Sequence, residues 1–254
     1  MILTVDIGNT TMTMGLYTPE GVLQFRGSIK TDKNKTRDQI AIDLLDMFQL
    51  YQADIRDVTG AVVSSVVPPM TGAMADAIRQ LSGVRPMIVG PGVKTGMNIL
   101  AEVHNQLGAD IVASSVAALQ KYPQPIIVID MGTATTLSVV DREGIFRGGM
   151  ILPGLRLSVD ALSARAAQLP CITFTQPEGL LGTDTVSCMR SGALYGAAAA
   201  LEGISLRLEE ELGPVTVVLT GGHGRDILPL LRRAVEYEPH LQLMGLRELW
   251  LRSL

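Results

Sequence analysis

The sequence predicts an α/β protein of two similar lobes with a cleft between them, and three observations support this prediction. Residues 2–29 and 126–151 share one pattern of short apolar runs separated by turns that contain glycine. Residues 58–69 and 215–224 form a second pair, and each is typical of a buried strand that leads into a helix. The 254 residues also suffice for two lobes of roughly 100–150 residues each.

The first pair of segments predicts three antiparallel strands at the start of each lobe. In both segments an apolar, β-branched run ends in Asp-x-Gly-polar-x-Thr, which starts at Asp6 in one and at Asp130 in the other. A second apolar run, a turn with Glu-Gly and a third run follow in each. Runs rich in Val, Ile and Thr that are separated by such turns are typical of a strand meander. We expect alternating helices and strands after each meander, so that one unit is present twice.

We place the division between the lobes so that residues 1–118 form the N-terminal lobe and residues 119–254 the C-terminal lobe. The second lobe contains an additional segment at about residues 152–190, which includes Pro153-Gly154 and Leu169-Pro170. Proline and glycine interrupt regular structure, so we expect this segment to be an insertion of helix and loop.

The composition argues against several partners and locations. The net charge is −4 and the basic cluster at residues 30–37 is interrupted by Asp32, which is unfavourable for nucleic acid because phosphate contacts need clustered Lys and Arg. The longest uncharged stretch, residues 58–75, contains prolines and Gly72, which break a membrane-spanning helix. Two cysteines and an N-terminus without a basic leader are typical of the reducing cytosol. We therefore expect a cytoplasmic protein that contacts neither nucleic acid nor membrane.

The repeated Asp-x-Gly turn can bind nucleotide phosphates. A tight turn after a strand exposes backbone N–H groups, and its glycine lets a phosphate approach the chain closely. Threonine hydroxyls add donors, and the aspartate at the strand end, Asp6 in the first copy, can hold a hydrated Mg²⁺ on the phosphates. Either turn alone also fits an ordinary hairpin, whereas the symmetric pair favours ATP. The residues of these turns expected to bind ATP are Asp6, Gly8, Asn9, Thr10, Thr11, Thr13, Gly132, Thr133 and Thr135.

A third glycine turn, Thr220-Gly221-Gly222, follows an apolar strand and opens a helix. The bare backbone at Gly221 and Gly222 leaves room for a ribose or an adenine, so we expect both to contact ATP; a plain strand-to-helix turn is the alternative. The chain has no Gly-Lys-[Ser/Thr] phosphate loop, because residues 90–95 have another order. It also has no Gly-x-Gly-x-x-Gly that opens a helix after a strand, which disfavours a dinucleotide enzyme.

Asp110 is the candidate general base. It follows Gly108-Ala109 and precedes an apolar helical pattern, so we expect it at a helix N-terminus. Aspartate is also a favoured N-cap, and capping alone would explain this position. A capping carboxylate stays ionised, however, and an ionised carboxylate can align a substrate hydroxyl for phosphoryl transfer. Both roles stay open on the residues alone.

The sequence pattern of residues 191–203 predicts a helix with small residues at positions 192, 196, 199 and 203. These positions lie on one flat face that can pack closely against another helix, either inside the lobe or in a second copy of the chain. Because 47% of the residues are hydrophobic, we expect apolar surface to be covered in a subunit interface as well as in the cores. The prediction is a stable homodimer.

Together these motifs resemble those of the type III pantothenate kinases, a family of the acetate kinase, sugar kinase, Hsp70 and actin superfamily. The resemblance spans nearly the whole chain. Its matching stretches are Asp6–Thr10, Ser65–Pro69, Lys94–Gly96, Gly108–Asp110, Asp130–Thr136, Gly148–Gly154, Gly182–Thr185, Met189–Gly192, Tyr195–Gly196 and Thr220–Gly222.

The resemblance implies two duplicated actin-like lobes and a chemical activity. It implies ATP-dependent phosphorylation of the primary hydroxyl of pantothenate, the first step of coenzyme A biosynthesis. Asp110 would accept the proton and Asp130 would bind a monovalent cation, K⁺ or NH₄⁺. ATP would lie against residues 6–13 and Thr133 in a homodimeric enzyme. The residues implied for pantothenate are Gly108, Ala109, Asp110, Ile111 and Thr185.

The chain departs from the family pattern close to the expected pantothenate site. Ile111 stands where the family has Arg, Ala101 where it has Tyr, and Val103-His104 where it has Asn-Pro. Ser138 stands where Asp is expected. Arg carries five donors and a full charge, so its replacement by Ile is not conservative. The alternative to the kinase is therefore a divergent paralogue that binds nucleotide, either as a regulatory protein or as a kinase of another small hydroxy compound.

Overall fold

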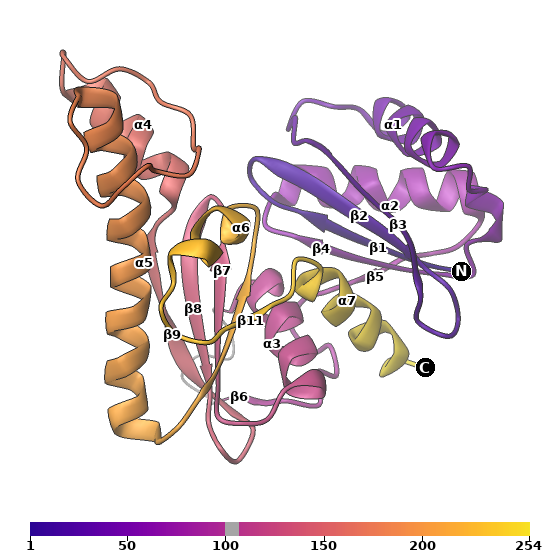
Figure 1. Ribbon diagram of the computed structural model, residues 1–254. Coiled ribbons are helices and arrows are strands. Elements are labelled where there is room, and N and C mark those ends of the chain that lie inside the picture. Colours follow the sequence, from indigo (N-terminus) through magenta and orange to yellow (C-terminus); the bar gives the residue numbers. More distant parts are fainter. Residues whose placement is uncertain (100–106) are drawn as a thin grey trace. The chain divides into compact units, whose positions relative to one another are not determined.

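The computed structural model (Figure 1) describes residues 1–99 and 107–254. The chain forms two compact units. Unit 1 consists of the described residues 1–97, 107–120 and 241–254, and unit 2 of residues 98–99 and 121–240. The main difference from our expected lobes is that we placed residues 241–254 in the second lobe and they pack with the first; residues 98–99 also belong to unit 2, and residues 119–120 to unit 1.

Unit 1 is built on a five-stranded sheet in the order β3-β2-β1-β4-β5. β1 pairs antiparallel with β2, and β2 with β3, so the first predicted meander is confirmed. β4 pairs parallel with both β1 and β5. The elements of unit 1 are β1 (Ile2–Ile7), β2 (Thr11–Tyr17), β3 (Leu23–Lys30), α1 (Arg37–Leu50), a 3₁₀ turn (Ile55–Asp57), β4 (Gly60–Ser65), α2 (Pro68–Ser82), β5 (Met87–Ile88), α3 (Ala109–Lys121, whose last residue belongs to unit 2) and α7 (Leu241–Leu251).

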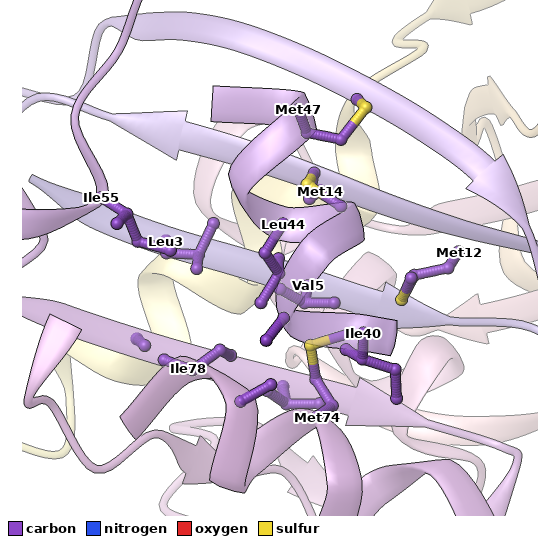
Figure 2. Packing of buried hydrophobic residues seen from close by; sticks show 14 of the residues in the cluster. Leu3, Val5, Met12, Met14, Ile40, Leu44, Met47, Ile55, Met74 and Ile78 are labelled. Atoms are coloured by element: carbon purple, nitrogen blue, oxygen red, sulfur yellow. The ribbon is translucent and has the colours of Figure 1, made fainter. Parts of the chain in front are cut away.

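One face of this sheet holds the main core of unit 1. Alternate residues of β1 and β2, among them Leu3, Val5 and Met14, are fully buried against α1 and α2 (Figure 2). α1 starts with a capping box in which Thr36 and Gln39 satisfy each other's backbone N–H groups. Apolar burial of this extent is the main source of stability for the unit.

The other face of the sheet packs against α7, which arrives from the far end of the chain. A Cβ on Gly60 of β4 would overlap the Trp250 ring, and one on Gly15 of β2 would lie 3.0 Å from Leu243. α7 also meets α3 backbone to backbone, since a Cβ on Gly245 would overlap Ala113. Glycines thus permit close approach at these contacts. The C-terminal helix is therefore an integral layer of unit 1.

Unit 2 repeats the plan with a six-stranded sheet in the order β11-β10-β7-β8-β9-β6. β7, β8 and β9 form the second antiparallel meander, and β10 pairs parallel with β7, as β4 does with β1. The second predicted meander is therefore confirmed. The elements are β6 (Asn98–Ile99), β7 (Ile126–Met131), β8 (Ala134–Val140), β9 (Ile145–Pro153), α4 (Leu155–Arg165), α5 (Thr185–Leu212), β10 (Thr216–Thr220), α6 (Gly224–Ile227), a 3₁₀ turn (Leu228–Leu230) and β11 (Glu236–Tyr237).

The long helix α5 covers one face of the second sheet (Figure 1). Its apolar residues Leu194, Ala198 and Leu201 pack against Ile127 and Ile129 of β7. The segment expected to be an insertion contains α4 and the loop 166–184, and α5 begins at its end. In the described part of the chain no helix is long and apolar enough to cross a membrane.

Candidate active site

β1 ends in a tight hairpin whose loop, residues 8–11, we call the first hairpin. The N–H of Gly8 donates to the carbonyl oxygen of Thr11 at 3.1 Å, which closes the turn. Asp6 precedes it and lies directly opposite Thr13 on β2 and Ser64 on β4. The carboxylate is mostly buried at the strand end. The sequence therefore placed Asp6 correctly beside the turn.

Thr31, the residue after β3, clamps this first hairpin. Its backbone N–H donates to the carbonyl oxygen of Thr10 at 3.0 Å, and its hydroxyl donates to that of Gly8 at 2.7 Å. In a planar trans peptide the C=O and the next N–H point in opposite directions, so the N–H of Asn9 is turned away from Thr31. An N–H fixed in this way is ready to bind an anion. Our sequence analysis did not single out Thr31, because its partners lie more than twenty positions away.

A row of polar side chains crosses the first sheet beside the hairpin. The cross-strand register aligns Ser64, Asp6, Thr13 and Ser28 on β4, β1, β2 and β3. Residues directly opposite each other share one face of a sheet, and the hydroxyls of Thr13 and Ser28 lie 3.2 Å apart. This row supplies hydroxyls on both sides of one carboxylate, which suits a hydrated cation held on phosphate oxygens.

The loop at residues 132–134, the second hairpin, repeats this arrangement in unit 2. The N–H of Gly132 donates to the carbonyl oxygen of Ala134 at 3.1 Å, and Asp130 lies opposite Thr136 and Thr220. The residue that corresponds to Thr31 has no side chain that could hold this turn. Gly154 follows β9 instead, and a Cβ there would overlap the carbonyl oxygen of Thr133.

Gly221 packs directly on Asp130. Its φ of 91° lies in the left-handed region, and a Cβ there would overlap Asp130 Oδ1 and the backbone of Met131. The N–H of His223 donates to the carbonyl oxygen of Met131 at 3.1 Å, which ties the glycine turn to β7. A Cβ on Gly222, by contrast, would meet nothing within 4 Å. The turn therefore combines one glycine required by the fold with one that faces open space, where a ligand can approach.

Asp110 lies in the first turn of α3, as expected from the sequence. Its Oδ1 accepts a hydrogen bond from the N–H of Ile111 at 2.9 Å and lies close to Gly108, where a Cβ would overlap it. The hydrogen bond fixes the orientation of the carboxylate at the start of the helix. Asp110 is half-buried, so the carboxylate still reaches solvent.

Thr185 is the first residue of α5, and its exposed side chain follows the N-cap Asp184. Hydrogen bonds from the N–H and the hydroxyl of Ser187 to the Asp184 carboxylate lower the pKa of Asp184, with smaller help from the N–H of Val186. This ionised cap fixes the start of the helix. It thereby fixes the backbone position from which Thr185 projects.

The predicted site residues thus fall into two groups by unit. Unit 1 contains Asp6, the first hairpin and residues 108–111, while unit 2 contains Asp130, the second hairpin, Gly221-Gly222 and Thr185. Ile111 is half-buried on α3. Ala101, Val103 and His104, where the chain departs from the family pattern, lie outside the described residues.

The donor set suits Mg²⁺ that arrives on a nucleotide. Among the described residues no three His, Cys, Asp or Glu side chains gather into a metal cage. Mg²⁺ in kinases is commonly held by one or two carboxylates together with substrate phosphates, and Asp6 at a strand end supplies one. Asp130, which packs against the glycine turn at Gly221, is the corresponding carboxylate of unit 2.

The duplicated meander-and-helix unit and its two Asp-Gly hairpins define the class of actin, Hsp70 and sugar kinase folds. Two solved structures match the chain over almost its full length. Component A of (R)-2-hydroxyglutaryl-CoA dehydratase from Acidaminococcus fermentans has a TM-score of 0.57 at 13% identity, over 99% of this chain and 96% of that one. The activator of 2-hydroxyisocaproyl-CoA dehydratase from Clostridium difficile, with bound ADPNP, has a TM-score of 0.55 at 12% identity, over 99% and 93%. The predicted fold class is confirmed.

Sequence comparison narrows this class to one family. The family model described as type III pantothenate kinase matches residues 2–207. A type III pantothenate kinase of Exiguobacterium sp. (strain ATCC BAA-1283 / AT1b) is 38% identical over 100% of this chain and 99% of its own length. One from Listeria monocytogenes is 37% identical over 100% and 98%. The chain belongs to the type III pantothenate kinase family.

Proposed function

We propose that the protein transfers the γ-phosphoryl group of ATP to the primary hydroxyl of pantothenate and forms 4′-phosphopantothenate, the first step of coenzyme A biosynthesis. Membership of the family supports the reaction. The main structural support for this reaction is the duplicated hairpin. In each copy, carbonyl oxygens of the Asp-Gly turn contact the residue that follows the third strand. The cytoplasm, which supplies ATP, is the proposed compartment. The relatives give no support to the alternative of a nucleotide-binding paralogue.

ATP would be bound by both hairpins through its phosphates. In the first hairpin the N–H of Asn9 and the hydroxyls of Thr10, Thr11 and Thr13 donate to phosphate oxygens, and Gly8 allows their approach. In the second, Gly132 and Thr133 have the same tasks. Thr135 is buried opposite Met131, on the other face of the sheet from Asp130, so its predicted phosphate contact is not part of the proposal. Gly221 and Gly222 would leave room for the nucleoside. Positioning and charge neutralisation by such groups supply most of the catalysis in phosphoryl transfer.

Two cations complete this nucleotide site in the proposal. Mg²⁺ on the phosphates, when bound, neutralises charge that develops during transfer. Asp6 would hold it through water, with the hydroxyls of Thr13 and Ser64 in the same row of the sheet. Asp130 would bind a monovalent cation, K⁺ or NH₄⁺. Gly221 keeps the Asp130 carboxylate in place, because its missing side chain is what lets the two approach.

Asp110 would be the general base for the acceptor. Its carboxylate orients the pantothenate hydroxyl and accepts the proton as the oxygen attacks phosphorus. Gly108, Ala109 and Ile111 would frame the substrate beside it, and Thr185 would contact it with its exposed hydroxyl. The hydrogen bond from the N–H of Ile111 orients the Asp110 carboxylate before the substrate arrives.

Replacement of Asp110 by Asn tests this proposal. Asp110→Asn keeps a side-chain oxygen that can accept from Ile111, so the melting temperature should hardly change. Turnover should fall by about 10²-fold or more, the usual scale for a lost general base, while MgATP binding survives. Asp38→Asn is the matched control, because Asp38 is also an acidic residue in the first turn of a helix. ADP release that depends on pantothenate is measured for all three proteins; full turnover of Asp110→Asn would refute the role.

We further propose that the protein is a homodimer through the small-residue face of α5. Gly192, Gly196 and Ala199 are exposed, and a Cβ on either glycine would meet nothing within 4 Å. The predicted stripe is therefore unused by the packing of unit 2. Light scattering at micromolar concentration should give a dimer, and Gly196→Arg should give a monomer. Gly90→Arg, at an exposed glycine of unit 1 that is equally free of neighbours, should remain dimeric.

A further inference from the structure

β3 carries two cations beside the first hairpin that the proposed mechanism does not use. Arg26 and Lys30 are exposed and stand two positions on either side of Ser28. Alternate residues of a strand share one face, and Ser28 lies on the Asp6 face because its hydroxyl contacts that of Thr13. Arg26 and Lys30 therefore lie on the same face of the sheet as Asp6.

The register places Lys30 directly at the turn. Lys30 lies opposite Thr11, the last residue of the first hairpin, and Arg26 lies opposite Gly15, further from it. Cβ atoms of directly opposed residues are about 5 Å apart, well within the reach of a lysine side chain. The next residue, Thr31, is bonded to the hairpin twice, so the backbone at Lys30 is held in this position.

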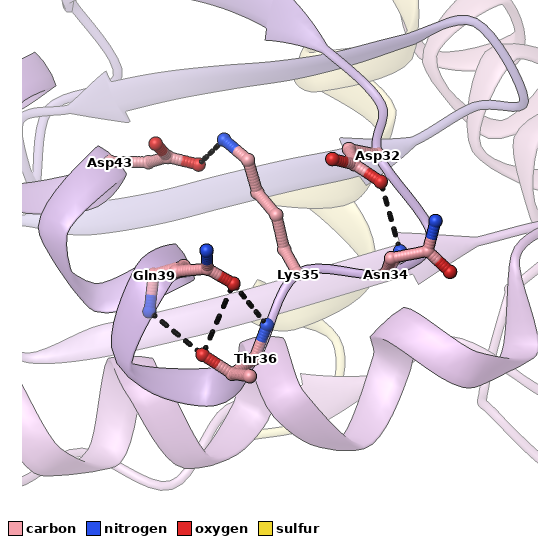
Figure 3. A network of polar contacts seen from close by, with 6 residues as sticks. All are labelled: Asp32, Asn34, Lys35, Thr36, Gln39 and Asp43. Atoms are coloured by element: carbon pink, nitrogen blue, oxygen red, sulfur yellow. Dashed lines mark hydrogen bonds and ion pairs between the residues drawn. The ribbon is translucent and has the colours of Figure 1, made fainter.

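Within residues 1–99 and 107–254, neither Lys30 nor Arg26 has an ion pair or a side-chain hydrogen bond. Two charged groups of the loop after β3 have partners of their own (Figure 3): Lys35 Nζ contacts Asp43 Oδ2 at 2.5 Å, and Asp32 accepts from the N–H of Asn34 at 3.0 Å. The ammonium group of Lys30 is therefore available to an outside anion.

A triphosphate needs such a group at this place. Neither hairpin contains Lys or Arg, and each is preceded by a negative aspartate, Asp6 or Asp130. In unit 2 the positions that correspond to Arg26, Ser28 and Lys30 are Gly149, Ile151 and Pro153, which carry no charge. The cation of β9, Arg147, lies six residues before Pro153 and contacts Asp141, whereas β3 has Lys30 directly at its hairpin. Of the two third strands, β3 is therefore the one that places positive charge beside its turn.

We propose that Lys30 binds the triphosphate of ATP at the first hairpin as a point charge. The inference rests on the proposed function, because it assumes that ATP binds there. Lysine ammonium groups commonly bind phosphates in this way, and hydrogen bonds between charged groups are stronger than neutral ones. Arg26 lies four residues before Lys30, which is about 13 Å along the strand at roughly 3.3 Å per residue. At that distance salt screens most of the attraction between Arg26 and the phosphates.

Calorimetry with MgATP, MgADP and AMP tests the assignment. Lys30→Ala should bind MgATP about tenfold more weakly than the unmodified protein. Its loss of affinity for MgADP should be smaller, and its affinity for AMP should hardly change. Lys30→Arg should restore most of the MgATP affinity. Arg26→Ala should show a smaller loss than Lys30→Ala. Arg85→Ala, which removes an exposed cation just before β5 at the opposite edge of the same sheet, should bind as the unmodified protein does.

The outcomes separate the two proposals. If the unmodified protein binds no MgATP, the proposed function fails and the inference fails with it. If the unmodified protein binds MgATP and Lys30→Ala binds it equally well, the inference alone is overturned. A loss of AMP binding as large as the loss of MgATP binding, with a lowered melting temperature, would show a structural role for Lys30 and would also overturn it.

Discussion

The first hairpin is hydrogen-bonded to the residue that follows the third strand, Thr31, whereas the second packs against a glycine at the corresponding place, Gly154. In both, a glycine N–H donates across the turn at 3.1 Å and an aspartate precedes it at the strand end. After the third strand, however, unit 1 has Thr31, which bonds the turn twice, and unit 2 has Gly154, which only packs against it. The loop of the first hairpin is also one residue longer.

This difference shows which features a duplicated unit retains. The strand pairing and the aspartate positions are common to both copies, because the backbone register alone determines them. Side chains on the third strand have diverged: β3 carries polar and basic residues beside the turn, and β9 carries an exposed Ile151 in the row of Asp130. The polar residues of β3 are suited to bind a phosphate, while the exposed apolar residue of β9 is suited to contact another protein surface.

The largest effect should come from Gly221, which packs on the second hairpin's aspartate and takes the position that Ser65 has in unit 1. Gly221→Ala puts a side chain at a φ of 91° and into Asp130, so stability should fall by at least about 2 kcal/mol and activity should be lost. Chemical denaturation and turnover measure both. Gly222→Ala, next to it in open space, should stay within about 0.5 kcal/mol of the unmodified protein. Equal effects at the two glycines would contradict the packing described.

A moderate effect should come from the clamp on the first hairpin. Thr31→Val keeps the shape of the side chain but removes the hydroxyl that donates to Gly8, so stability should fall by about 1 kcal/mol. The KM for ATP should rise, because the turn loses the bond that orients the N–H of Asn9. Thr31→Ser keeps the hydroxyl and is the control. If the Val and Ser variants melt and turn over alike, the clamp has no functional role.

The smallest effect should distinguish the two capping boxes by pH. The box of α1 is neutral, with Thr36 and Gln39, whereas that of α5 contains the carboxylate of Asp184, whose pKa is lowered by its bonds from Ser187. A lowered pKa in the folded state means that the stabilisation is present above the ordinary value of 3.8 and is lost as the pH falls below it.

Melting temperatures between about pH 3 and pH 6 measure this difference. The gap between the unmodified protein and Asp184→Ala should narrow towards the acid end, because protonation weakens the cap in the unmodified protein. The gap for Thr36→Ala should stay constant over the same range. A constant gap for both variants would mean that Asp184 is not the group that titrates.

Much of this architecture could be predicted from the sequence because it depends on local patterns. Runs of β-branched residues that end in Asp-x-Gly located both meanders and put Asp6 and Asp130 at strand ends. The position of Asp110 in the first turn of a helix followed from the Gly-Ala-Asp before an apolar pattern. Their roles in catalysis stay predictions.

Other features depend on contacts between distant residues, which local patterns do not reveal. Thr31 looked like part of a basic surface loop, and its contact with Gly8 becomes visible only when β3 is placed beside β2. An alignment of the two repeats would have put Thr31 opposite Gly154 and drawn attention to both. Likewise, nothing in residues 241–251 indicates which of two sheets the helix covers.

The return of α7 to unit 1 affects the order of events during synthesis. When residues 1–120 have left the ribosome, the sheet of unit 1 has its strands, but Gly15 and Gly60 still lack Leu243 and Trp250. All of unit 2 must be translated before α7 is available to pack on this sheet, so the folding of unit 1 is completed last. Incomplete chains therefore leave Gly15 and Gly60 on this face of the formed sheet without their cover, a state open to aggregation and to chaperones. A C-terminal truncation of only fourteen residues, 241–254, would keep the protein in that state permanently.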